Sequence, residues 1–133
     1  MRAADVLCAT TNASAPVLRG AWLRRGAHVN GVGSYTPSMQ EVDEEAVRLC
    51  RVVIDEEGAR SVGDLSAYLE QGEVNENAVG TLGALLAGDI AVAHDPEGRT
   101  FFKSVGVAVQ DIATAHAVLR AAKARGIGFY TSF

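Results

Sequence analysis

Three short, mainly apolar runs constrain the fold of this chain more than any other feature of its sequence. They cover residues 5–10, 27–32 and 52–55. The first has no capping or turn signal before it, which is typical of a strand buried on both faces of a parallel sheet. A helical pattern separates the second run from the third, and a further strand is expected at 100–103. This order of strand, loop, helix and strand indicates an α/β fold with about three parallel strands.

Length and composition narrow the class of protein. The chain has 133 residues, 48% of them apolar, which is enough for one domain with a buried core. No stretch approaches the roughly 18 apolar residues of a membrane span, and the first five residues do not begin a signal peptide. Without such a span, a membrane is not expected as a partner. The formal charge of −4 gives no attraction to phosphate backbones, so a nucleic acid is not expected either. Cys8 and Cys50 lie in apolar runs, and we expect two buried, reduced thiols in a cytoplasmic protein.

The first helix is expected shortly after Pro37. Ser38 can serve as its N-cap, and Glu41 three residues later completes a capping-box pattern. The acidic residues 43–45 lie near this helix start, where the helix dipole explains them better than acid–base catalysis does.

The longest helix is expected near the end of the chain. Its apolar positions recur at helical spacing from residue 105 to residue 122, Ser104 can cap its start, and Gly126 ends it. Two shorter helices are expected before it. Residues 61–64 cap the first, and the second follows the apolar positions of 79–86 and stops at Gly88.

Polar and glycine residues follow the expected strands at the points where ligands bind in open α/β sheets. Thr10 and Thr11 follow the first strand, and Gly33 and Ser34 follow the second. Hydroxyls can bond a ribose or a carboxamide, and glycines let a backbone approach a ring or a phosphate closely. A solvated loop and a structural turn are the ordinary alternatives, and for an isolated G-x-G pattern the turn is favoured.

The start of the last helix is a further candidate. Ser104 joins a strand end to a helix N-terminus, whose N–H groups and dipole favour an anionic or carbonyl-bearing ligand. An ordinary serine N-cap is the alternative. Asp111 lies off the apolar face of this helix, either solvated or in polar contact with the site.

Other residue patterns add no second site. The three histidines have no ligand spacing, so no metal is expected. Residues 55–57 are expected to form a solvated turn. The sequence contains no G-x-S-x-G, no Walker motif and no complete G-x-G-x-x-G.

Two segments carry a resemblance to a known family. They are GAHVNGVGS at residues 26–34 and FKSVGVAVQD at residues 102–111. Shorter matches at 4–6, 16–18, 22–23, 41–43 and 63–65 lie in the same order along the chain. Together they resemble the ornithine cyclodeaminase/mu-crystallin family over nearly the whole chain.

The resemblance implies an NAD(P)-binding Rossmann domain joined to a dimerisation and substrate domain. It covers only the C-terminal part of that plan. Residues 1–95 then form a partial Rossmann-like domain, and residues 96–133 form a strand and a long helix that return toward the dimerisation and substrate domain. The chain is therefore expected to be a truncated part of a larger, cytoplasmic, homodimeric enzyme.

The resemblance also implies a reaction and individual contacts. The reaction is hydride transfer between NAD or NADP and a small imino or amino acid, as in ketimine reductases and amino-acid dehydrogenases. Residues 32–34 line the nicotinamide side, and Val105 contacts the substrate. The implied cofactor contacts are Thr10, Thr11, Val32, Gly33, Ser34, Met39 and Ser104.

One position departs from the family pattern. In ornithine cyclodeaminases, an aspartate two residues before the loop proline acts in proton transfer, and here Tyr35 stands two residues before Pro37. A phenol with a pKa near 10 does not replace an ionised carboxylate at neutral pH, so the catalytic residue stays unassigned. Ornithine cyclodeamination is one alternative function. An inert fragment without the glycine-rich pyrophosphate loop is the other.

Overall fold

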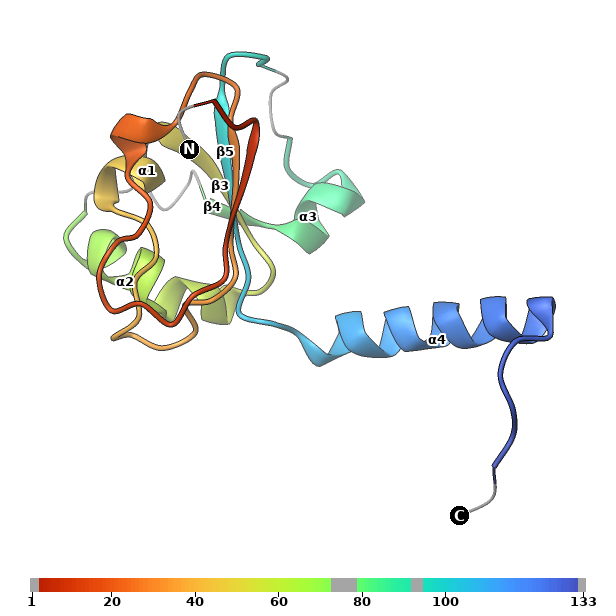
Figure 1. Ribbon diagram of the computed structural model, residues 1–133. Coiled ribbons are helices and arrows are strands. Elements are labelled where there is room, and N and C mark those ends of the chain that lie inside the picture. The colour runs from red at the N-terminus through yellow and green to blue at the C-terminus, as the bar shows by residue number, and fades with distance from the viewer. Residues whose placement is uncertain (1–2, 73–78, 92–94, 132–133) are drawn as a thin grey trace.

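The computed structural model describes residues 3–72, 79–91 and 95–131, and these form an α/β fold (Figure 1). The five strands are β1 (Val6–Ala9), β2 (His28–Gly31), β3 (Cys50–Ile54), β4 (Val79–Thr81) and β5 (Arg99–Lys103). The helices are α1 (Glu44–Leu49), α2 (Gly63–Glu70), α3 (Leu82–Ala87) and α4 (Ala108–Arg125). Two short 3₁₀ helices, η1 (Gly20–Trp22) and η2 (Glu57–Ser61), lie in the connections.

The strands form one sheet in the order β1-β2-β5-β3-β4, and every neighbouring pair is parallel. The predicted α/β fold with parallel strands is thus confirmed. The expected number of about three strands is too low. Residues 79–81, expected as part of a helix, instead pair with β3.

Helices α1 and α2 cover one face of the sheet (Figure 1). The core lies between these two layers and is built from buried apolar side chains of both. Its larger members are Leu7, Val29, Val42, Val47, Val52, Ile54, Leu65 and Phe101.

The expected burial of the first strand on both faces is wrong. In β1, Leu7 and Ala9 point into the core, whereas Val6 is 59% exposed and Cys8 is also exposed. The reason is that α1 and α2 lie on one side of the sheet only (Figure 1). Of the two thiols expected to be buried, only that of Cys50 is.

Helix α1 begins later than the sequence pattern indicates. Its N-cap is Asp43, whose Oδ1 accepts a hydrogen bond from the Ala46 N–H at 2.9 Å. Ser38 is exposed and caps no helix, so the predicted capping box is wrong. Glu44 and Glu45 do lie in the first turn, where they favour the positive end of the helix dipole.

The prediction that glycines end two of the helices is confirmed. Gly88 ends α3 and Gly126 ends α4, both in the left-handed conformation with φ of 84° and 62°. The predicted start of the last helix is wrong, because α4 begins at Ala108 and not after Ser104. Likewise, no side chain of residues 61–64 caps α2, which begins after Val62.

Helix α4 extends away from the sheet, and none of its residues is buried (Figure 1). The apolar face that the sequence predicts is therefore exposed to solvent. Strand β5 lies in the middle of the sheet, between β2 and β3. The division of the chain at residue 95 stays a prediction. Within the described residues, no helix combines the length and apolar character needed to cross a membrane.

Candidate functional site

The five strands of the described residues end at the same level of the sheet. Ala9 pairs with Gly31, Lys103 pairs with both Gly31 and Ile54, and Ile54 pairs with Thr81. The segments that follow these residues therefore lie along one edge. In open α/β sheets, this carboxyl edge is where ligands bind. All predicted contact residues except Met39 follow β1, β2 or β5 within three residues of the strand end.

Glu41 joins the segments that follow β1 and β2. Its side chain is fully buried, and its carboxylate accepts hydrogen bonds from the main-chain N–H groups of Thr11, Gly33 and Ser34. The distances to Gly33 and Ser34 are 2.8 and 3.2 Å. The sequence pattern assigns Glu41 to a capping box, and it gives no signal for this arrangement because Thr11 lies 30 residues away.

Gly33 is required by the close approach of these two segments. A Cβ atom on Gly33 would lie 2.0 Å from the carbonyl oxygen of Thr11 and 2.5 Å from Oε1 of Glu41. Both distances are far below van der Waals contact. This packing accounts for a glycine at residue 33 without any ligand.

A buried ion pair between Lys103 and Asp64 holds the main chain of the segments that contain Ser34 and Glu41. Nζ of Lys103 lies 3.1 Å from Oδ2 of Asp64 and donates a hydrogen bond to the Ser34 carbonyl, and both charged side chains are fully buried. Oδ1 of Asp64 accepts from the N–H groups of Glu41 and Val42 at 2.6 and 3.1 Å. Removing one member of such a pair leaves an uncompensated buried charge, which costs about 3–5 kcal/mol.

Asp55 holds the segment after β5. Its Oδ2 accepts hydrogen bonds from the Ser104 hydroxyl at 2.9 Å and from the N–H groups of Val105 and Gly106 at 2.8 and 2.9 Å. The predicted solvated turn is therefore wrong for Asp55. These donors also do not form a helix N-terminus open to an anion, because α4 begins two residues after Gly106 and a carboxylate of the chain already occupies them.

The predicted contact residues differ in accessibility. Thr10, Thr11 and Val32 are exposed at the carboxyl edge. Ser34 is fully buried, and its hydroxyl donates to the carbonyl of the half-buried Met39 at 3.0 Å. In the isolated chain, the Ser34 hydroxyl is thus used internally.

The remaining predicted residues lie at the same edge. Ser104 is 8% exposed, and Val105 beside it is half-buried. Tyr35, which stands at the position of the family aspartate, is 60% exposed. Asp111 is not one of these residues: it lies exposed in the first turn of α4.

The described residues contain no group of three histidine, cysteine or acidic side chains that could hold a metal ion. His28 bonds to Thr100 and Asn30 on neighbouring positions of the sheet, at 2.7 and 3.1 Å. His116 lies exposed on α4, and His94 is outside the described residues.

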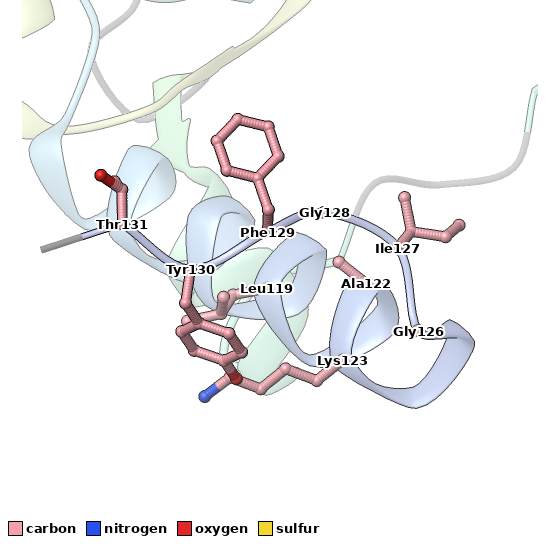
Figure 2. A pocket seen from close by; sticks show the side chains of 9 residues that line it. All are labelled: Leu119, Ala122, Lys123, Gly126, Ile127, Gly128, Phe129, Tyr130 and Thr131. Atoms are coloured by element: carbon pink, nitrogen blue, oxygen red, sulfur yellow. The ribbon is translucent and has the colours of Figure 1, made fainter.

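A hollow of about 650 Å³ lies elsewhere, between the end of α4 and residues 126–131 (Figure 2). Phe129 and Tyr130 in its lining are at least 90% exposed, and in Figure 2 they point to opposite sides of the chain. It contains none of the predicted contact residues. The carboxyl edge of the sheet is therefore the candidate site.

Comparison with known proteins identifies the family of this chain. The model of the ornithine cyclodeaminase/mu-crystallin family matches residues 1–126. The chain belongs to this family. The resemblance of its sequence motifs is thus confirmed.

Several relatives of this family member are reductases or dehydrogenases. The Delta(1)-pyrroline-2-carboxylate reductase of Bacillus cereus is 39% identical over 132 residues, which are 96% of this chain and 40% of that protein. The alanine dehydrogenase of Archaeoglobus fulgidus is 32% identical over 131 residues, 97% of this chain and 41% of that protein. The chain therefore spans about 40% of the length of these relatives.

Solved structures of the family share the fold. The Thermococcus litoralis Delta(1)-pyrroline-2-carboxylate reductase, in complex with NADH and L-proline, superposes with a TM-score of 0.84 at 32% identity. The match covers 98% of this chain and 41% of that one. The iminosuccinate reductase of Paracoccus denitrificans, in complex with NAD+, gives a TM-score of 0.81 at 33% identity over 98% and 40% of the two chains.

Proposed function

We propose that this chain forms the nicotinamide side of an NAD(P)-dependent oxidoreductase that acts on a small imino or amino acid. The observation that carries this proposal is the common level at which β1, β2 and β5 end. It brings Thr10, Val32 and Val105 to one edge of the sheet, although they are up to 95 residues apart in sequence. The complex of a relative with NADH and L-proline supports the same class of cofactor and substrate.

The residues at this edge fit one end of a dinucleotide. Thr10 and Thr11 are exposed residues whose hydroxyls can bond a ribose or a carboxamide, although the Thr11 hydroxyl also accepts from the Ala13 N–H at 3.3 Å. Val32 offers an exposed apolar surface for a ring. The 133 residues contain no G-x-G-x-x-G, the sequence that binds the pyrophosphate in dinucleotide-binding domains. We therefore assign only the nicotinamide half of the cofactor to this chain.

Bound NAD or NADP would supply or accept the hydride, and the residues of this chain would orient it. In our proposal, Thr10 and Thr11 bind polar groups of the nicotinamide half, Val32 and Gly33 line its ring, and Ser104 and Met39 make the remaining contacts. The half-buried Val105 excludes water on the substrate side. We also propose that residues 96–133, which include β5 and α4, return the chain toward a dimerisation and substrate domain.

Ornithine cyclodeamination is the second candidate, because the family includes this activity. The exposed Tyr35 argues against it, since a phenol does not accept a proton at neutral pH as a carboxylate does. The two reactions are distinguished by their products. A cyclodeaminase releases ammonia from ornithine, whereas a reductase oxidises NADH or NADPH in the presence of a cyclic imino acid.

Titration of the chain with NADH and NADPH, followed by nicotinamide fluorescence, tests the proposal. We expect saturable binding that nicotinamide mononucleotide displaces and adenosine monophosphate does not, because only the nicotinamide half finds contacts. Val32→Asp should abolish this binding. Val118→Asp, at a similarly exposed valine on α4, should leave it unchanged.

Absence of binding to either nucleotide would overturn the proposal and favour the inert fragment. Displacement by adenosine monophosphate would show that the chain contacts the adenosine half of the cofactor, contrary to the proposal.

A further inference from the structure

The buried carboxylate of Glu41 has no role in the function proposed above. Its side chain has no exposed surface, so it does not touch a ligand at the carboxyl edge. We propose that Glu41 is a positioning residue that holds the segments after β1 and β2 in the single conformation in which they receive the nicotinamide half of the cofactor. The identity of that ligand rests on the proposed function, whereas the contacts of Glu41 do not.

The Glu41 side chain satisfies donors from two separate segments. Thr11 belongs to the segment after β1, and Gly33 and Ser34 belong to the segment after β2. Hydrogen bonds to an ionised acceptor are stronger than those between neutral groups. A buried carboxylate is tolerated only where donors compensate its lost hydration, and here three N–H groups do so.

The main chain of Glu41 is itself held by hydrogen bonds at both its N–H and its carbonyl group. Its N–H donates to Oδ1 of Asp64 at 2.6 Å. Its carbonyl accepts from the N–H groups of Val17 and Leu18 at 2.9 and 3.0 Å. The carboxylate is thus attached to the core, and it links both segments to the core in addition to the hydrogen bonds that Ser34 makes with Lys103 and Met39.

Very little space separates the two segments. They approach so closely that Gly33 has no room for a Cβ atom, which would lie 2.4 Å from the Thr11 nitrogen. Without the carboxylate, the three N–H groups of Thr11, Gly33 and Ser34 would have no acceptor. We therefore expect the segments to separate when the acceptor is removed, and Thr11 and Val32 to lose their fixed positions.

Glu41→Gln is the decisive variant, because it keeps the shape of the side chain. A glutamine has one acceptor oxygen and an NH₂ group, so the N–H groups of either Thr11 or Gly33 and Ser34 would face a donor. Amide hydrogen exchange, measured residue by residue by NMR without any ligand, should show exchange at the affected amides about tenfold faster or more. The affinity for NADH, measured by nicotinamide fluorescence, should fall by a similar factor.

Two control variants separate positioning from general stability. Glu70→Gln makes the same chemical change at an exposed position of α2, and neither exchange nor affinity should change. Val47→Ala removes core contacts of α1, where the side chain is fully buried, without touching Glu41. It should lower the stability of the whole fold but leave the affinity for NADH unchanged while the chain is folded.

Each outcome decides the proposal. Unchanged exchange at the amides of Thr11, Gly33 and Ser34 in Glu41→Gln overturns it. The same holds if exchange at these three amides is accelerated no more, relative to other amides, than it is in Val47→Ala. If amide exchange in Glu41→Gln is faster but the affinity for NADH is unchanged, Glu41 does not position the segments for the cofactor. A wild-type chain that binds no NADH contradicts the proposed function, while selective exchange in Glu41→Gln would still confirm that Glu41 holds the two segments.

A second variant covers the case in which Glu41→Gln does not fold. Glu41→Asp keeps the charge but shortens the side chain by one methylene group, so the carboxylate no longer reaches all three donors. Exchange should be faster at one or more of Thr11, Gly33 and Ser34. No selective change in this variant would also overturn the proposal.

Discussion

At the scale of single residues, the two cysteines have opposite environments. Burial raises the pKa of the Cys50 thiol from 9.0 to about 12, with a smaller opposing effect of the nearby Arg99. The Cys50 thiol is therefore protonated at physiological pH. Cys8 lies on the uncovered face of β1, where its sulfur accepts a hydrogen bond of 3.6 Å from Asn30.

Thiol labelling should distinguish the two cysteines. Because the thiolate is the reactive species, a disulfide reagent at pH 8 should modify Cys8 rapidly in the folded chain and Cys50 only after unfolding. Absorbance of the released thiol should give one equivalent in buffer and two in urea. Cys8→Ser should abolish the rapid equivalent, and two rapid equivalents in the wild type would contradict the burial of Cys50.

Residue type and local spacing predict some single-residue roles and not others. The glycine stops at residues 88 and 126 follow from the left-handed conformation that glycine adopts without strain. The roles of Glu41 and Asp55 do not follow from spacing, because most of their donors lie 30 to 51 residues away or are main-chain groups that any residue carries. Only the fold brings these donors together.

At the scale of elements, the segment between β5 and α4 depends on Asp55. Both carboxylate oxygens are used, since Oδ1 accepts from the N–H of Glu56 at 2.9 Å and Oδ2 accepts from three donors of residues 104–106. The segment therefore leaves the sheet in a defined direction, with Gly106 in the left-handed region at φ 84°.

Asp55→Asn should weaken this connection. Asparagine has one acceptor oxygen and places an NH₂ group against existing donors, so we expect a loss of about 1–3 kcal/mol in the free energy of unfolding. Urea unfolding followed by circular dichroism measures it. Glu56→Gln, at the exposed neighbouring residue, should change stability by less than about 0.5 kcal/mol. Equal losses in the two variants would show that the Asp55 contacts carry no stability.

The start of α1 shows why element boundaries are harder to predict than elements. Ser38 and Asp43 are both acceptable N-caps, and local sequence does not rank them. Tertiary structure decides, because Oδ1 of Asp43 also accepts from the N–H of Gly20 at 2.8 Å. Gly20 lies so close to α1 that a Cβ there would be 2.5 Å from the Ala46 nitrogen. The helix is thus fixed at a position that depends on a segment 23 residues earlier.

At the scale of the whole molecule, the chain is less compact than its size allows. Its accessible surface is 8447 Å², whereas a compact monomer of the same mass exposes about 6,700 Å². Helix α4 accounts for part of the excess, since it extends from the sheet with no buried residue (Figure 1). Ile112 and Leu119 on this helix are 69% and 54% exposed.

Two leucine truncations test whether α4 is free in solution. Leu65→Ala empties a fully buried position of α2 and should cost about 2–5 kcal/mol of unfolding free energy. Leu119→Ala, on the exposed face of α4, should change it by less than about 0.5 kcal/mol. Urea unfolding of both variants at several protein concentrations measures the difference. A large, concentration-dependent loss in Leu119→Ala would contradict an exposed α4 and show that a second copy of the chain covers it, because only association makes stability depend on concentration.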